Sequence, residues 1–333
     1  MTRAYDELGE AEQVEVLRGV ALRAAAAFGL EVEGMALALH GYNTTFRVDG
    51  RDGRRLALRV GTNSHSTPEH AVAQQAWLGA IAAETDVRVP EPLRTPDGGW
   101  LVSVDAEELG RAVLVTMASW LEGPDAEVLE PDSARALGRT MAALHAQAAG
   151  WAPPPGGALP RLDAPLFGDL DVLDDAPGLT ADDRSVLDTA RSRATEVFDR
   201  LHRGAQVRPL HADLHGGNLK WHERRLSVFD FDDAGLGLPV LDLAISAFYL
   251  RGGDPALEVA LREGYAEVAP LPEADQADVE ALIASRQLLL ANALLVSTTA
   301  EHRAQAADYT GVALARLRHW LASGRFSLDP GGG

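Results

Sequence analysis

The order of apolar and polar positions predicts short strands near the N-terminus and long helices after them. Apolar side chains recur about once per helical turn over residues 12–29, which predicts an amphipathic helix. Alternation and turn residues predict strands at 35–40, 44–48, 55–60, 100–104 and 111–117, with a helix over 67–83 between the third and fourth. The later pattern predicts helices over 133–147, 182–203 and 243–250, and two or three more within 273–323. Strands followed by helices indicate an α+β chain.

One polar stretch interrupts the helical pattern: residues 211–244, HADLHGGNLKWHERRLSVFDFDDAGLGLPVLDLA. His211, Asp213 and Asn218 have the spacing H-x-D-x-x-x-x-N, and Asp230 ends the strand-like run 226–229. Transfer of a nucleotide phosphate needs a carboxylate facing the attacking hydroxyl and oxygen ligands for Mg²⁺. We therefore expect Asp213 to act as the base, and Asn218 and Asp230 to bind the metal. The alternative is a His–Asp capping loop followed by an acidic turn.

The segments HADLHGGN, FDFDDAG and DLA resemble the catalytic and metal loops of the aminoglycoside phosphotransferase (APH) superfamily. The form is most similar to the subgroup of SrkA-type stress-response kinases and homoserine kinases, and it extends over residues 35 to 320. This resemblance implies a protein-kinase-like fold with two lobes, the first an antiparallel sheet and the second mostly helical. The implied division is a small lobe with an N-terminal helix at 1–118, a hinge at 119–123, a catalytic and acceptor-binding lobe at 124–329, and a disordered tail at 330–333.

The resemblance also implies a nucleotide site in the small lobe. Gly41, Asn43 and Thr44 take the place of the loop that covers the phosphates, and Arg59 that of the lysine that holds them. Arg keeps the charge, and its planar fork suits phosphate oxygens. Gln74 occupies the position of the glutamate that pairs with this cation, so the ion pair is reduced to a hydrogen bond. The implied hinge residues, which would bind the purine edge, are Ser119, Trp120 and Leu121.

Three further residues of the motif have supporting roles by the same resemblance. His211 supports the loop by hydrogen bonding, and Asp242 buttresses it through backbone N–H groups. Asp232 reaches a second metal or the acceptor, or only caps the turn. The implied cofactors are Mg²⁺ and a phosphoryl donor, ATP or GTP.

The composition restricts the partners. The net charge of −19 argues against nucleic acid and against an anionic membrane. It favours a cationic acceptor or simply confers solubility, and the acidic run at 163–175 is either part of an acceptor site or a solvated loop. The apolar stretch 279–296 is interrupted by polar residues such as Arg286, which predicts a core helix. Without cysteine or a signal-peptide pattern at the N-terminus, a cytoplasmic location is expected.

The function that we expect is transfer of the γ-phosphate of ATP or GTP to a hydroxyl of a small, amine-bearing acceptor. An aminoglycoside, another antibiotic, an amino alcohol or an amino acid would fit. One alternative is an SrkA-like Ser/Thr protein kinase that uses the same residues. Another is a pseudokinase that serves as a binding module, which the departures at Gln74 and Arg59 motivate.

Overall fold

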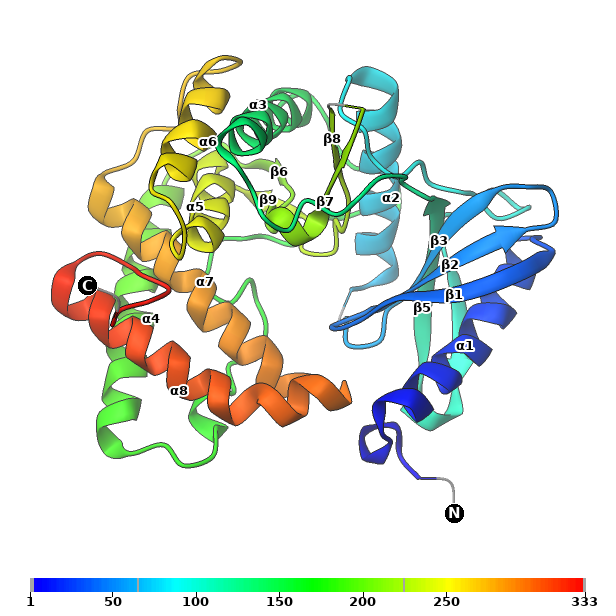
Figure 1. The fold of residues 1–333 in the computed structure, drawn as a ribbon, viewed down its shortest axis with the longest axis horizontal. Helices are drawn as coiled ribbons and strands as arrows, with labels where there is room; N and C mark the ends of the chain where they lie inside the picture. The colour runs from blue at the N-terminus through cyan, green and yellow to red at the C-terminus, as the bar shows by residue number, and fades with distance from the viewer. Residues whose placement is uncertain (1–2, 65, 224, 332–333) are drawn as a thin grey trace.

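The computed structural model describes residues 3–64, 66–223 and 225–331, and it has two lobes that lie side by side (Figure 1). The smaller lobe contains helix α1 (Glu10–Ala27) and one antiparallel sheet in the order β1-β2-β3-β5-β4. Its strands are β1 (Val32–His40), β2 (Thr44–Gly50), β3 (Arg55–Val60), β4 (Val102–Ala106) and β5 (Arg111–Ser119). The predicted strands are all present, and the fourth begins two residues later than expected.

Strand β3 has one face toward α1 and one toward the other lobe. Leu56, Leu58 and Val60 are buried in the core that α1 covers. Because side chains alternate along a strand, Arg59 points to the opposite face of the sheet. In α1, Leu17 and Val20 are completely buried in the same core. The N-terminal helix therefore packs on the sheet.

Helix α2 (Pro68–Glu84) stands between the two lobes (Figure 1). Its N-terminus is capped by the Thr67 hydroxyl, which accepts from the backbone N–H of His70 at 3.2 Å, and Pro68 occupies the first turn. Trp77 is fully buried and meets Phe231 edge to face, with ring centroids 5.4 Å apart. This contact packs α2 against the loop that carries Asp230.

The larger lobe is helical, with two short hairpin-like sheets. Its helices are α3 (Pro131–Ala148), α4 (Ala181–His202), α5 (Pro239–Leu250), α6 (Ala256–Ala266), α7 (Gln276–Val296) and α8 (Ala300–Ser323). Strands β6 (Arg208–Leu210) and β9 (Gly235–Gly237) pair with each other, as do β7 (Leu219–His222) and β8 (Arg225–Val228). Short 3-10 turns lie at Tyr5–Glu7, Glu107–Leu109, Leu173–Asp175 and Gly216–Asn218. Of the expected tail at 330–333, residues 332–333 lie outside the described residues.

Helix α6, which the sequence did not predict, crosses α3 at two glycines. A Cβ on Gly138 would lie 2.0 Å from the carbonyl oxygen of Leu261, and a Cβ on Gly264 would lie 2.0 Å from that of Arg135. The helices can approach this closely only because neither position has a side chain. This contact fixes α3, whose last turn carries His145 beneath the catalytic loop.

Helix α7 is long and apolar enough to cross a membrane, but 67% of its apolar window is buried inside the protein. It packs against α4, α5 and α8 in the core of the larger lobe. It is therefore the core helix that the interrupted apolar stretch predicted.

Candidate active site

The buried carboxylate of Asp242 bonds the backbone of residues 211–218, which we call the catalytic loop. Asp242, near the start of α5, accepts from the backbone N–H groups of His211 at 3.2 Å and Ala212 at 2.7 Å. Nε2 of His145 lies 2.9 Å from the same carboxylate. Ala212 has φ of 62°, a left-handed conformation that costs energy for a residue with a side chain. The bonds to Asp242 keep the backbone in this conformation and present the next residue, Asp213, to the space between the lobes.

Both carboxylate oxygens of Asp213 have partners. One accepts from the guanidinium of Arg286 and from the Tyr249 hydroxyl, which is 3.2 Å away. The other accepts from the side-chain amide of Asn218 at 3.0 Å. Burial raises the pKa of Asp213, but the charge of Arg286, together with the interactions of His215 and His211, outweighs burial and holds the pKa well below its usual range. The carboxylate is therefore ionised and able to accept a further hydrogen bond.

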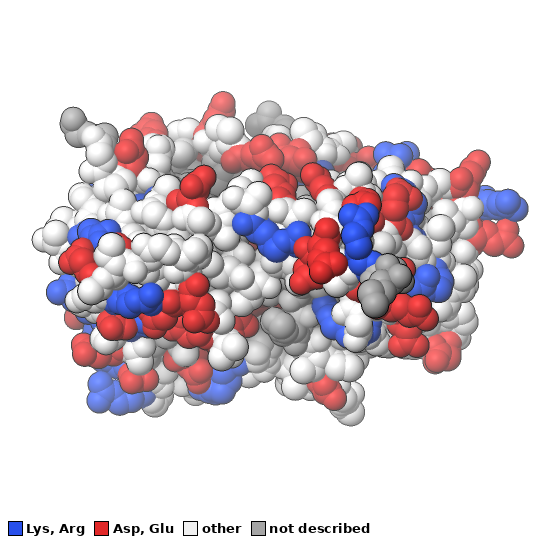
Figure 2. Space-filling view, turned by 90° about the horizontal axis from the view of Figure 1, so that it is seen from below, with Lys and Arg blue, Asp and Glu red and all other residues white. Residues whose placement is uncertain are grey.

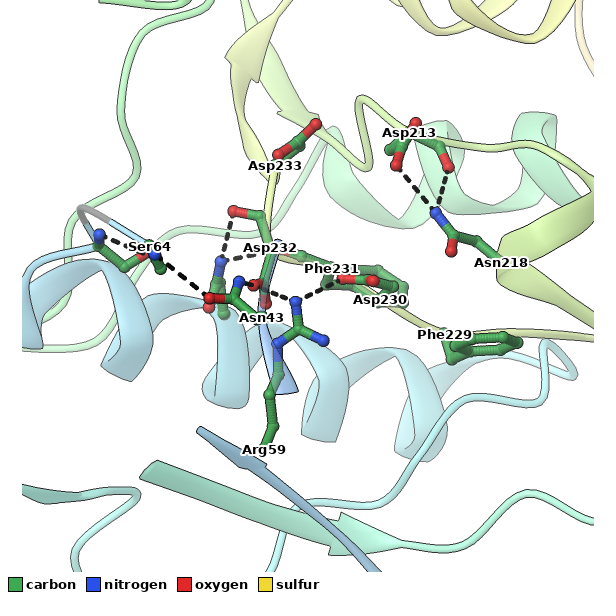
Figure 3. Close-up of polar contacts among 12 residues, drawn as sticks. Asn43, Arg59, Ser64, Asp213, Asn218, Phe229, Asp230, Phe231, Asp232 and Asp233 are labelled. Carbon is green, nitrogen blue, oxygen red and sulfur yellow. Dashed lines mark hydrogen bonds and ion pairs between the residues drawn. The ribbon is translucent and has the colours of Figure 1, made fainter. Parts of the chain in front are cut away.

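Asn218 and Asp230 have the chemistry expected of magnesium ligands. The amide nitrogen of Asn218 also donates to the backbone carbonyl of Asp213 at 2.9 Å, so its oxygen is directed away from that residue (Figure 3). Among the residues that the structure describes, no three acidic or histidine side chains group to enclose a cation. Mg²⁺ needs no such enclosure, because it is commonly held by one or two side-chain oxygens, water and nucleotide phosphates. The two residues present therefore fit a magnesium that arrives with the nucleotide.

The side chain of Arg59, on β3, extends to residues 230–235 of the larger lobe. We call this segment, which carries the candidate ligand Asp230, the metal loop. The guanidinium of Arg59 lies 3.0 Å from Asp230 and donates to Asp232, which also accepts from the amide of Asn43 (Figure 3). Burial raises the pKa of Asp230 to about 6, an effect that Asp232 adds to and the charge of Arg59 opposes. The two carboxylates in turn raise the pKa of Arg59 above its usual range, although burial acts in the other direction.

Gln74 does not contribute the hydrogen bond to Arg59 that the sequence predicted. Its amide nitrogen donates to the backbone carbonyls of Phe231 at 2.9 Å and Asp232 at 3.0 Å. One turn earlier in α2, Nε2 of His70 donates to the carbonyl of Ala234 at 2.8 Å. An amide can donate to a carbonyl, whereas an ionised glutamate cannot. Glutamine at this position therefore fixes the metal loop, and the counter-charges of Arg59 come from that loop itself.

Two cavities meet at Arg59 and Asp230. The first, of about 510 Å³, lies beneath the sheet, and the second, of about 560 Å³, extends between the catalytic loops and α7. The first is lined by residues that include Leu37, Leu39, Ser119, Trp120, Leu121 and Lys220. The second is lined by residues that include Tyr42, Asn43, Asp169, Asp213, Asp232, Asp233 and Arg286. Arg59 and Asp230 belong to both linings, so a group passing between the cavities must pass these two side chains.

The expected phosphate-covering loop is only partly placed as predicted. Asn43 lines the second cavity, but Gly41 and Thr44 line neither one. Thr44 is fully buried, and its hydroxyl bonds with Nδ1 of His40 at 2.8 Å and the Thr62 hydroxyl at 2.9 Å. The alternation of β2 turns this side chain into the small lobe, so its hydroxyl is bonded there and does not face the second cavity.

The tip of this loop is bonded to the turn between α7 and α8. The Thr299 hydroxyl donates to the carbonyl of Gly41 at 2.6 Å. Asn63 bridges the same parts: its amide nitrogen donates to the carbonyl of Tyr42 at 2.7 Å, and its oxygen accepts from the backbone N–H of Thr298 at 2.7 Å. The small lobe is thus connected to the larger one at a second place, remote from the hinge segment.

The sequence did not identify Arg286 as a site residue. Its buried guanidinium bonds Asp213 and lies 3.2 Å from Asp233 and 3.0 Å from the Tyr249 hydroxyl. Burial raises the pKa of Asp233 to about 7, and the nearby Asp213 adds to this effect while Arg286 opposes it. The sequence contained one signal for this role: Arg286 lies within the mostly apolar stretch 279–296. An arginine buried in such a helix needs a partner of opposite charge.

The acidic run at 163–175 is mostly paired within the large lobe. Asp163 lies 2.5 Å from Arg161, and Asp171 and Asp174 lie 2.8 and 3.1 Å from Arg191. Among the described carboxylates of this run, Asp169 alone lines the second cavity. Figure 2 shows acidic and basic side chains interspersed over both ends of one face. Three members of the run are thus in ion pairs at the surface, and Asp169 reaches the site.

Two lobes, with the loops that carry Asp213 and Asp230 at the junction of two cavities, are the arrangement of a kinase-like phosphotransferase. The sequence model of the phosphotransferase enzyme family, APH, matches residues 36–279. The chain belongs to this family, whose members transfer phosphate to hydroxyl groups and generally use ATP with Mg²⁺.

The individual relatives agree with this assignment. The chain is 32% identical over 271 residues to an uncharacterized protein of Deinococcus radiodurans, across 78% of this chain and 77% of that one. It is 30% identical over 219 residues to a homoserine kinase of Gluconobacter oxydans, across 62% of this chain and 67% of the relative. The solved structure of a microcompartment-associated aminopropanol kinase superposes with a TM-score of 0.72 at 25% identity, across 93% of this chain and 99% of that one.

Proposed function

We propose that this chain transfers the γ-phosphate of ATP or GTP to a hydroxyl of a small, amine-bearing acceptor. The observation that carries the proposal is the meeting of two cavities at Arg59 and Asp230, with Asp213 in the second. The nucleotide would occupy the first cavity, with its purine edge at the hinge residues 119–123 and its phosphates at the junction. The acceptor would occupy the second, within the large lobe at 124–329. The small lobe at 1–118 would cover the nucleotide.

In this proposal Asp213 accepts a hydrogen bond from the acceptor hydroxyl and orients its oxygen toward the γ-phosphorus. A bond forms between that oxygen and phosphorus, the bond from phosphorus to the β,γ-bridging oxygen breaks, and ADP or GDP leaves. The hydroxyl proton passes to Asp213. A carboxylate of such low basicity suits a loose transition state, in which the hydroxyl is deprotonated late.

The remaining residues hold the donor. Asn218 and Asp230 would hold Mg²⁺, which neutralises charge on the phosphates. The fork of Arg59 lies where it can bond phosphate oxygens and stabilise the charge that develops on them. His211, Asp242 and Gln74 keep the two loops in place, and Asp232 keeps Arg59 at the junction.

Three observations support an amine on the acceptor. The second cavity is lined by Asp169 and Asp233, and the chain has a net charge of −19. Two of the similar proteins are named for homoserine and aminopropanol, each of which has an amine and a hydroxyl. We place the reaction in the cytoplasm, without nucleic acid or membrane as partner.

A transfer assay with the full chain, Mg²⁺ and ATP or GTP tests this function. The acceptor panel contains homoserine, 1-amino-2-propanol, its amine-free match 1,2-propanediol, and casein as a generic protein substrate. We expect phosphorylated product from an amino alcohol or amino acid, and a lower kcat/KM for the diol. Labelling of casein alone would favour the SrkA-like protein kinase. Nucleotide binding without any transfer would favour the binding module.

A further inference from the structure

Helix α7 presents an apolar stripe to the second cavity. After Arg286, the residues of α7 that line this cavity are spaced three or four apart or adjacent, as on one face of a helix. We call them the α7 stripe: Leu289, Leu290, Ala293 and Leu294. Three of them are only partly buried, although the opposite faces of the helix pack in the core. The stripe is therefore apolar surface that the fold leaves facing the cavity.

A turn in the segment before α4 adds more apolar surface to the same cavity. Phe167 has φ of 54° and Gly168 has φ of 90°, so two successive residues are left-handed. This conformation is strained for phenylalanine. Backbone bonds hold the turn, from Phe167 to Ala164 at 3.1 Å and from Asp169 to Leu166 at 2.9 Å. The result is that Phe167, like the buried Leu162, lines the cavity.

Two polar side chains near the stripe each have one partner within the protein. The Tyr309 hydroxyl accepts from the amide nitrogen of Gln287 at 3.0 Å, and Nδ1 of His302 lies 3.0 Å from the Ser297 hydroxyl. The carboxylate of Asp213 lies at the Arg286 end, where the reacting hydroxyl must be. A ligand hydroxyl placed against the leucine side chains of the stripe would lose its water, because those side chains offer no hydrogen-bond partner.

We propose that the α7 stripe selects an acceptor whose reacting hydroxyl is attached to a compact apolar body, and that it rejects polyhydroxylated rings. This inference rests on the proposed function, because it concerns the acceptor of the same site. The cavity volume of about 560 Å³ is in the range of small-molecule sites, and the cavity must also receive the γ-phosphate. The carbon skeleton packs on the stripe while the hydroxyl faces Asp213.

The test measures binding separately from transfer. Ethanolamine, 1-amino-2-propanol, 1-amino-2-butanol and spectinomycin are titrated by calorimetry into the full chain saturated with Mg²⁺ and non-hydrolysable AMP-PNP. We expect affinity to rise about tenfold with each added carbon, as for a methylene in an apolar pocket. Spectinomycin should bind at least about a hundredfold more weakly than 1-amino-2-butanol, and the heat capacity of binding should become more negative along the series.

Variants of the stripe identify its contribution. Leu290→Asn and Leu294→Asn should flatten the series, and Val312→Asn, an exposed position of α8 outside the cavity, should leave it unchanged. Ala293→Leu adds volume without polarity, so it serves even where an asparagine variant fails to fold. It should reverse the order and favour ethanolamine over 1-amino-2-butanol.

Two results separate this inference from the proposed function. A flat affinity series, tighter binding of spectinomycin, or no binding by any member of the panel would overturn the selectivity of the stripe. Product formation by mass spectrometry is scored independently. A rising affinity series without transferred phosphate would overturn the proposed function and retain the apolar acceptor site.

Discussion

The side-chain amide of Gln74 donates to the backbone carbonyl of Phe231 at 2.9 Å, so α2 is bonded directly to the loop that carries Asp230. In the family pattern from which this chain departs, a glutamate at this place pairs with the cation of β3. Here the cation, Arg59, pairs with Asp230 and Asp232 of the loop. Gln74 thus bonds the backbone of the metal loop, and the side chains of that loop replace the missing glutamate as partners of Arg59.

Gln74→Glu should destabilise the metal loop, because the carboxylate would face two carbonyl oxygens. We expect a loss of about 1–3 kcal/mol in the free energy of unfolding, and weaker binding of Mg²⁺–ATP. Gln74→Met, which removes the donors without adding charge, should fall between wild type and Gln74→Glu. Thermal melting with and without Mg²⁺–ATP measures both effects. Wild-type stability and affinity in Gln74→Glu would show that these bonds are unimportant.

Asp213→Asn should lower turnover by a factor of about 10²–10⁴, while the nucleotide still binds. The reason is that the lost carboxylate acts on the acceptor hydroxyl and not on the donor. The measurements are kcat with an accepted amino alcohol and the Kd of Mg²⁺–AMP-PNP. Asp163→Asn, which alters a surface ion pair, is the matched control. Near-normal turnover in Asp213→Asn would remove this residue from the mechanism.

Asp230→Ala should abolish magnesium-dependent nucleotide binding, and Asn218→Ala should weaken it less, because a neutral amide contributes less to holding a divalent cation. The increase in melting temperature on addition of Mg²⁺–AMP-PNP reports the binding. Nucleotide without Mg²⁺ is the control. An unchanged increase in Asp230→Ala would contradict the metal assignment.

Arg59→Ala should raise the KM for ATP and lower kcat, since a positive charge is lost from both the bound state and the transition state. Arg59→Lys keeps the charge but not the planar fork, so it separates charge from geometry. Arg54→Ala, in the turn before the same strand and bonded to Asp52 at the surface, should change neither constant. Equal KM values for Arg59→Ala and wild type would place the guanidinium away from the phosphates.

The pKa of Asp233, raised to about 7, predicts a pH-dependent stability. The folded protein holds this proton more tightly than the unfolded chain does, so stability falls as the pH rises from about 4 to about 7. Asp233→Asn removes the titrating group. Its melting temperature should exceed that of wild type at pH 8, and the difference should shrink toward pH 5. A constant difference across this range would contradict the raised pKa.

Local sequence patterns predicted the small lobe well. Strand β3 was predicted with both of its ends, because its alternation is bounded by a glycine turn at residues 50–53. The kinase-like two-lobe fold that the resemblance implied is confirmed by the family match and the similar solved structure. Helix α6 was missed although its buried residues Ala260, Leu261, Gly264 and Tyr265 have helical spacing. Only its close crossing with α3 at Gly138 and Gly264 is beyond a local pattern.

The candidate site was predictable from the residues alone where they are close in sequence, and through the family resemblance for Arg59. Asp213, Asn218 and Asp230 fall within one motif, and the structure brings them together. Arg286 is 73 residues from Asp213, and its role follows from the packing of α7 beside the catalytic loop. Thr44 was assigned from a loop position, but the direction of its side chain is set by the pleat of β2, and the hydroxyl points inward.

The hydrogen bond from Thr299 to Gly41 connects the proposed acceptor site with the proposed nucleotide site. Helix α7 carries the proposed acceptor wall, and the turn after it bonds the loop at Gly41, which is the proposed phosphate-covering loop. Because of this bond, we expect a displacement of α7 by a bound acceptor to change the position of that loop. Thermodynamic linkage then requires reciprocity: the factor by which acceptor changes nucleotide affinity equals the factor by which nucleotide changes acceptor affinity. Order of addition would affect the rates of assembly of the ternary complex, but never its final stability.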